Sequence, residues 1–175
     1  MLAIIWIVWR LFNGLKNRKA DWKNEVRLLP AVICIAVIMG IVYFNWNPSN
    51  GRLGYLIFDL HRMIPFKINL ELFDSIRHGY AGWKQNLWGN IQMFIPVGFI
   101  WPYSFKKLDH IGKVVLAGAA FSLFIELSQL LFFQRSTDID DVLSNTVGTL
   151  IGAILYFSID RMLKYYEKEE EKHIE

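Results

Sequence analysis

The sequence predicts an all-α fold, a polytopic bundle of transmembrane helices with four to five spans and an extracellular interfacial loop. The 175-residue chain is 54% hydrophobic and 15% aromatic, with a mean hydropathy of +0.27, above the usual range of soluble globular proteins. It also contains four long stretches nearly free of charge: Leu28–Phe44, Asn86–Phe105, Val114–Phe133 and Val142–Ile159. Each has about the 17–25 residues that a helix needs to cross the hydrocarbon core.

Membrane-spanning strands are a poor alternative, because these stretches show no strict alternation of polar and apolar residues. In lipid the backbone must satisfy its own hydrogen bonds, and a helix does so within one segment. The single cysteine, Cys34, allows no internal disulfide. We therefore expect one membrane domain: a short helix and basic loop over 1–27, a helical core over 28–160 and a charged tail over 161–175.

The amino-terminal element is a short apolar segment, Leu2–Phe12, that contains Arg10. It has neither the preceding basic residue nor the following small-residue cleavage site of a signal peptide. The segment either crosses the membrane, with Arg10 reaching toward the interface, or lies along the membrane surface. The chain therefore has five spans in the first case and four in the second.

The distribution of lysine and arginine predicts the orientation. Asn13–Arg27, Lys106–Lys113 and the tail carry twelve of these residues, and the connections on the other side carry six. We therefore expect a multi-pass cell-membrane protein with a cytoplasmic carboxyl terminus, and with the long Trp46–Gln85 and the short Gln134–Asp141 connections outside. The net charge of +3 reflects this orientation, and we expect no nucleic-acid partner.

The long outer connection is predicted to carry structure of its own. Asn69 is a candidate helix N-cap, and the mixture of apolar and charged residues over Leu70–Arg77 suits a short amphipathic helix at the interface. Such a helix either anchors the loop on the membrane surface or forms a lid over a membrane-embedded pocket.

Polar side chains recur on one face of the third long stretch. Gly118, Ser122, Glu126 and Gln129 follow one another at spacings of four, four and three residues, which places them on the same side of a helix. A carboxylate within a membrane costs about 2.5–3.5 kcal/mol on insertion scales, so it should face a partner or water. Glu126 is therefore a candidate site residue.

The last stretch carries a similar face, formed by Asp138, Asp141, Asn145, Gly148 and Gly152. The two glycines form a pair of small residues four apart, which lets another helix approach closely. The polar members lie near the outer end of the helix, as do Asn86 and Asn90 of the second stretch. We predict one shared outward-facing polar pocket, formed by Asn90, Glu126, Gln129, Arg135, Asp138, Asp141 and Asn145.

Structural roles remain open for some of these residues. Thr137 and Asp140 have capping-box spacing, and aspartates are favourable at a helix amino terminus because of its dipole. Asn145 and Gln129 could hydrogen-bond between helices. Glu126 could pair with Arg135 and hold the bundle together.

Over about Met63–Gly152 the chain resembles the VanZ-like family of bacterial membrane proteins, through the motifs "MIPF", "NIQMFIPVGFIWP" and "FSLFIELSQLLFFQRSTDIDDVLSNTVGTLIG". The resemblance implies a role in lowering susceptibility to glycopeptide antibiotics such as teicoplanin, at the cell envelope of Gram-positive bacteria. The residues that match the family's motifs are Pro65, Phe66, Asn90, Phe94, Pro96, Gly98, Pro102, Glu126, Gln129, Arg135, Asp138, Asp140, Asp141, Asn145 and Gly148.

The preferred mechanism is binding of an envelope ligand. Arg135 would hold the phosphate or carboxylate of a membrane lipid, a lipid-linked peptidoglycan precursor or the drug, because its guanidinium binds such groups with two hydrogen bonds. The remaining ligand-binding residues would be Asn90, Gln129, Asp140 and Asn145. No cofactor is expected, although the carboxylates leave room for a divalent cation.

The alternative is an enzyme that modifies an envelope lipid or a peptidoglycan precursor. Glu126, Asp138 and Asp141 would then be catalytic, as an acid/base set of carboxylates or as oxygen ligands of a divalent cation. A transporter is disfavoured because the chain is short, has no detectable internal repeat and keeps its polar groups near one face.

Overall fold

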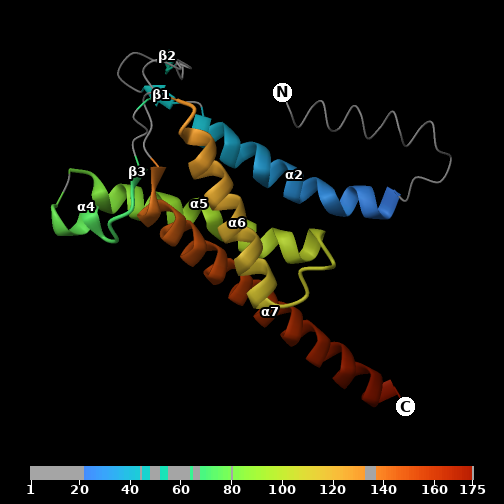
Figure 1. Ribbon diagram of the computed structural model, residues 1–175. Helices are drawn as coiled ribbons and strands as arrows, with labels where there is room; N and C mark the ends of the chain where they lie inside the picture. The colour runs from blue at the N-terminus through green and yellow to red at the C-terminus, as the bar shows by residue number, and fades with distance from the viewer. Residues whose placement is uncertain are drawn as a thin grey trace.

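The computed structural model describes residues 22–43, 45–47, 52–54, 64, 68–79, 81–132 and 137–174. Most of them belong to four long helices, which pack as a bundle (Figure 1). The helices are α2 (Trp22–Tyr43), α5 (Trp83–Ser104), α6 (Ile111–Gln129) and α7 (Ile139–Ile174), with the single turn α4 (Asp74–Arg77) between α2 and α5. The predicted all-α bundle is confirmed.

Two pairs of short strands lie outside the helices. β1 (Asn45–Asn47) and β2 (Arg52–Gly54) pair antiparallel. β3 (Ile68–Asn69) pairs in parallel with β4 (Thr137–Asp138). The second pairing joins the segment before α4 to the residues directly before α7.

Three of the described helices are long and apolar enough to cross a membrane: α2, α6 and Ile139–His173 of α7. α5 has 22 residues, as many as α2, but its lysine, glutamine and asparagine residues make it less apolar, and it is not among the three. The three apolar helices indicate a membrane protein, as predicted. The segment Leu2–Phe12 lies outside the described residues.

α5 and α7 approach each other more closely than side chains would allow. A Cβ atom built on Gly148 would collide with the carbonyl oxygen of Ile91, and one on Gly152 would collide with that of Ile95. In the other direction, a Cβ on Gly98 would collide with the carbonyl oxygen of Thr149. Glycines at these positions bring the two backbones together. The predicted close approach of a helix to Gly148 and Gly152 is thus confirmed, with α5 as the partner.

The other two long helices pack around this pair (Figure 1). α6 lies against α7, where Gly118 faces the side chain of Thr149. α2 lies against α5. The buried core between them contains Ala31, Cys34, Ile38 and Val42 of α2, Phe94, Val97 and Trp101 of α5, and Ile125 of α6.

The connection between α5 and α6 ends in a capped helix start. The ring nitrogen Nδ1 of His110 accepts a hydrogen bond from the backbone N–H of Lys113 at 3.3 Å. The ammonium of Lys113 in turn donates to the carboxylate of Asp109 at 2.8 Å. This hydrogen bond lowers the pKa of Asp109. His110 and its neighbours therefore begin α6 three residues earlier than the apolar stretch suggested.

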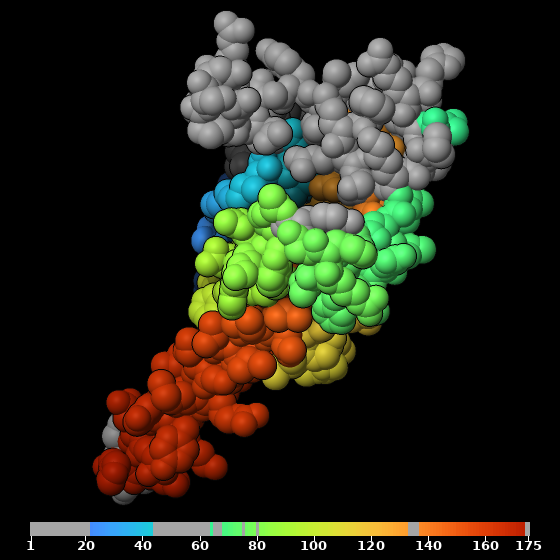
Figure 2. Space-filling view, turned by 90° about the vertical axis from the view of Figure 1, so that its left-hand side faces the viewer, coloured from blue at the N-terminus to red at the C-terminus, as the bar shows by residue number. Residues whose placement is uncertain are grey.

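The charged tail is helical and not a separate segment. α7 runs without interruption to Ile174, and its carboxyl-terminal part projects beyond the other helices (Figures 1 and 2). Lys164 pairs with Asp160 at 2.7 Å and Lys172 with Glu169 at 2.8 Å. Pairs three or four residues apart stabilise an exposed helix, which explains why helix continues where the apolar pattern stops.

The amphipathic helix predicted over Leu70–Arg77 is wrong in its extent and its cap. Only Asp74–Arg77 is helical, and the residue before it, Phe73, has a left-handed backbone with φ of 62°. Asn69 is extended because it pairs with Asp138 in the β3–β4 ladder. Its Oδ1 accepts the backbone N–H of Glu71 at 3.1 Å, which is a local turn and not a helix cap.

Candidate functional site

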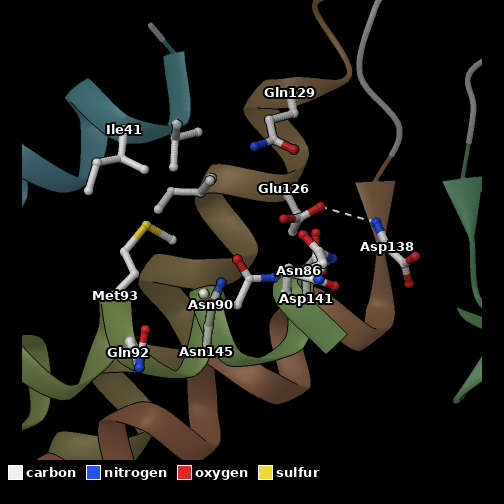
Figure 3. Close-up of a pocket in the computed structure, with 14 residues that line it drawn as sticks. Ile41, Asn86, Asn90, Gln92, Met93, Glu126, Gln129, Asp138, Asp141 and Asn145 are labelled. Carbon is white, nitrogen blue, oxygen red and sulfur yellow. Dashed lines mark hydrogen bonds between the residues drawn. The ribbon is translucent and has the colours of Figure 1, made fainter. Parts of the chain in front are cut away.

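A cavity of about 680 Å³ lies between the four long helices, at the end of the bundle where α2 and α6 end and α5 and α7 begin (Figure 3). Its volume falls within the range of roughly 300–1,000 Å³ that is typical of ligand pockets. The lining residues are Ile41, Val42, Gln85, Asn86, Gly89, Asn90, Gln92, Met93, Ile125, Glu126, Gln129, Asp138, Asp141 and Asn145. The structure therefore brings together six residues that the sequence predicted for one pocket: Asn90, Glu126, Gln129, Asp138, Asp141 and Asn145.

Asp141 receives two hydrogen bonds from α5. The side-chain amides of Asn86 and Asn90 donate to its Oδ1, at 2.9 and 2.7 Å. The two asparagines are one helical turn apart, so they approach the same carboxylate from one side. Asp141 also stands in the first turn of α7, where the helix dipole favours a negative charge. The carboxylate thus joins α5 to α7 at the cavity wall.

Glu126 joins α6 to the segment before α7. It is 2% exposed, and its Oε2 accepts the backbone N–H of Asp138 at 3.1 Å (Figure 3). One residue earlier, the hydroxyl of Thr137 donates to the carbonyl oxygen of Glu126 at 2.8 Å. A buried carboxylate needs such partners to offset the loss of its hydration. The predicted face of Gly118, Ser122, Glu126 and Gln129 is buried, as expected of a face that packs inward.

Asp138 serves both as a helix cap and as part of the cavity wall. Its Oδ1 accepts the backbone N–H of Asp140 at 2.9 Å, at the start of α7. Its Oδ2 accepts the side-chain amide of Asn69 at 3.3 Å, and the same amide donates to Asp74 at 3.2 Å. The spacing of Thr137 and Asp140 suggested that Thr137 caps this helix, but its hydroxyl donates to the carbonyl oxygen of Glu126 in α6. Asp138 is the N-cap residue instead.

Asp140 lies apart from the main cavity. Its Oδ1 accepts the backbone N–H of Phe73 at 2.7 Å, so it holds the turn before α4 against the start of α7. It lines a smaller, mainly apolar cavity of about 150 Å³ together with Phe73 and Ile76. The expected role of Asp140 in ligand binding gains no support from this position. Arg135, Pro65 and Phe66 lie outside the described residues, and so does the expected Glu126–Arg135 pair.

Asn145 spans the interface between α7 and α6. It is 2% exposed, and its amide nitrogen donates to the hydroxyl of Ser122 at 2.8 Å. The predicted hydrogen bond of Asn145 between helices is thus confirmed. Its other amide atom, Oδ1, has no hydrogen-bond partner among the described residues.

Some residues at the site were not among the predicted ones. Gln85 and Gln92 also line the cavity, and their spacings of four and three residues from Gly89 are a sequence signal that would have placed them on one face of α5. Tyr43 at the end of α2 hydrogen-bonds through its hydroxyl to that of Ser128 in α6. Nothing in the local sequence pairs these two residues, which are 85 positions apart.

The cavity wall is rich in hydrogen-bond acceptors. It carries the carboxylates of Glu126, Asp138 and Asp141, and none of its described lining residues is a lysine or an arginine. Within the described ranges no group of three or more histidine, cysteine, aspartate or glutamate residues is placed to hold a metal ion. The arrangement is suited to a polar or positively charged group that donates hydrogen bonds.

Comparison with known proteins agrees with the resemblance stated above and extends it. The sequence model of the VanZ/LLP1 family matches residues 31–161. Protein VanZ of Enterococcus faecium is 37% identical over 105 residues, which is 60% of this chain and 62% of that protein. The chain thus spans about three fifths of the length of this curated relative. No solved structure matches. Because the family match covers most of the chain, from residue 31 within α2 through α5 and α6 to residue 161 of α7, the protein belongs to the VanZ/LLP1 family.

Proposed function

We propose that this protein lowers susceptibility to glycopeptide antibiotics such as teicoplanin by binding an envelope ligand in its polar cavity. The ligand is a membrane lipid, a lipid-linked peptidoglycan precursor or the drug itself. Family membership supports the class of function. The observation that carries the binding role is the convergence of polar side chains from α5, α6 and α7 on one cavity of ligand size.

The proposed orientation places the mouth of this cavity on the outer side of the membrane. Lys106, Lys107 and Lys113 lie at the opposite end of the bundle, in or next to the connection between α5 and α6. The projecting part of α7, with Lys164 and Lys172, extends from that same end. Positively charged connections favour the cytoplasm, so the cavity faces the compartment in which glycopeptides act.

A membrane-embedded enzyme is the second candidate. Glu126 and Asp141 come from different helices and line the same cavity, so one carboxyl group could donate a proton where the other accepts one. The two candidates differ in a simple readout: an enzyme leaves a chemically altered envelope lipid or precursor. Mass spectra of lipid extracts from cells with and without the protein would show such a product, and a binding protein would leave the extracts unchanged.

The binding proposal is tested by removing charge at constant size. Glu126→Gln and Asp141→Asn keep hydrogen-bonding capacity, and asparagine is still acceptable near a helix start. The variants are introduced into a strain in which deletion of the gene raises susceptibility to teicoplanin. We expect both to reach the membrane at normal levels and to lose most of the protective effect.

Asp160→Asn is the matched control, because Asp160 lies in α7 at the opposite end from the cavity and pairs with Lys164. The Asp160→Asn variant should raise the minimum inhibitory concentration of teicoplanin as much as the unchanged protein does. The proposal fails if Glu126→Gln and Asp141→Asn are both present in the membrane and protect as well as Asp160→Asn does.

A further inference from the structure

The segment between β3 and α5 exposes an apolar surface that the proposed function does not use. Four large apolar side chains within seven residues are exposed, and they form what we call the α4 patch: Leu70 at 72%, Leu72 at 49%, Phe73 at 46% and Ile76 at 41%. A gathering of exposed apolar side chains marks contact with another protein or with a membrane.

The backbone that carries the α4 patch is fixed to the start of α7. The backbone N–H of Phe73 donates to Oδ1 of Asp140 at 2.7 Å. The side-chain amide of Asn69 donates to Asp138 at 3.3 Å and to Asp74 at 3.2 Å. Phe73 also has a left-handed backbone, which a bulky residue adopts only where its surroundings hold it. The patch therefore has a defined position relative to α7, and its depth follows from that helix.

The start of α7 places the α4 patch at a membrane interface. β3 pairs with β4, which directly precedes α7. The apolar stretch of α7 begins at Val142, three residues after the first helical residue, Ile139, and thus about 4.5 Å further along the axis. The interfacial region of a bilayer is roughly 5–8 Å thick on each side of the hydrocarbon core. The patch therefore lies at the level of this region.

The small cavity beneath α4 connects the patch to the lipid-facing surface of the bundle. Phe73 and Ile76 line this cavity of about 150 Å³ together with Leu143 and Val147 of α7. Leu143 and Val147 belong to the apolar stretch and are 40% and 38% exposed. Exposed apolar side chains of a membrane-crossing helix face lipid, so the α4 patch continues a surface that lipid covers.

A lid over the main cavity was the other role predicted for this segment, and the contacts do not favour it. No described residue of Ile68–Arg77 lines the main cavity. α4 lies on the opposite side of the bundle from α2 (Figure 1), whereas Ile41 and Val42 of α2 form part of the wall of that cavity.

We propose that the α4 patch inserts into the membrane interface at this end of the bundle, which is the outer leaflet in the proposed orientation. Its partner is the glycerol and upper acyl region of the lipids. Trp88, in the second turn of α5, is 60% exposed near the same end of the bundle, and tryptophan is enriched at membrane interfaces. Because the patch is fixed to Asp138 and Asp140, this contact also anchors the start of α7 at the bilayer surface.

The test uses the full-length protein in nanodiscs, which leave both faces of the bilayer open to solution. In a Cys34→Ala background, Leu70→Cys and, in a separate variant, Leu72→Cys are labelled with a fluorescent probe. One set of discs contains lipid with a nitroxide quencher close to the glycerol, and the other set is exposed to iodide in solution. We expect both probes to lose most of their fluorescence to the nitroxide and little to iodide, since an interfacial segment lies about 5–10 Å into the headgroup and acyl boundary.

Two exposed positions of α7 calibrate the measurement. Leu155→Cys lies four residues before the end of the apolar stretch, about 6 Å from its other boundary, and reports contact with lipid. Glu170→Cys lies in the projecting part of α7 and reports contact with water. The probes at positions 70 and 72 should resemble the probe at position 155.

Two results would overturn the inference. Quenching by iodide as strong as at position 170, without quenching by nitroxide, would place the α4 patch in water. Protection from both quenchers would show that protein covers the patch, for example a second copy of this chain. Neither quencher depends on a ligand in the main cavity or on the orientation in cells, so this inference can fail while the proposed function stands, and the reverse.

Discussion

Replacing Gly148 by alanine should destabilise the bundle, although alanine is a better helix former than glycine. The added Cβ would collide with the carbonyl oxygen of Ile91, a backbone atom that cannot rotate away, so α5 and α7 must move apart. Overpacking of this kind costs about 1–3 kcal/mol. The better helix propensity of alanine returns about 0.5–1 kcal/mol, which leaves a net loss of up to roughly 2.5 kcal/mol.

The measurement is the melting temperature of the detergent-solubilised protein, followed as the fraction that stays monodisperse after heating. For a chain of this size, 1 kcal/mol corresponds to about 2–4 °C, so the melting temperature is expected to decrease by up to about 10 °C. The control is Gly40→Ala on α2, where a Cβ has no neighbour within 4 Å. That variant should melt at the same temperature or slightly higher. The close backbone contact is refuted if Gly148→Ala is as stable as Gly40→Ala.

Two further predictions concern the orientation and the contact between α2 and α6. In a Cys34→Ala background, cysteine in place of the exposed Glu71 should react with an impermeant maleimide on intact cells, and cysteine in place of the exposed Lys107 should react only after lysis. The reverse pattern would move the cavity to the cytoplasmic side. Tyr43→Phe removes the hydroxyl that contacts Ser128 and should lower the stability by about 0.5–1.5 kcal/mol, seen as a decrease of a few degrees in the same melting assay. An unchanged melting temperature would show that this hydrogen bond does not hold α2 in place.

Features that depend on helical periodicity were predictable from the sequence. Spacings of three and four residues placed Glu126 and Gln129 on a buried face, and placed Asp141 and Asn145 on the face that lines the cavity. The glycine pair of α7 was predictable for the same reason, since two small residues four apart form one shallow strip on a helix. In each case the informative residues belong to a single segment.

Features that depend on distant pairing were not predictable. The β3–β4 ladder joins two residues on each side across nearly 70 positions, and so short a ladder leaves no periodic pattern. This pairing keeps Asn69 extended, although its residue type favours a helix cap. Asp140 lies in the sequence between two cavity residues, Asp138 and Asp141, but its own carboxylate accepts the backbone N–H of Phe73 and does not line the cavity. From the local sequence alone, Asp138, Asp140 and Asp141 are equally plausible site residues. Only their tertiary contacts show which of them line the cavity.

The length of α7 has a mechanical consequence. The helix is in close contact with α5 at Gly152, and its two ends extend from that point as unequal arms. Asp141 is about 16 Å from Gly152 along the axis and Ile174 is about 33 Å away, at 1.5 Å per residue. The charged arm is thus about twice as long as the arm that ends at Asp141, so a sideways force on the charged end acts on the α5–α7 contact with about twice the leverage of the same force at Asp141.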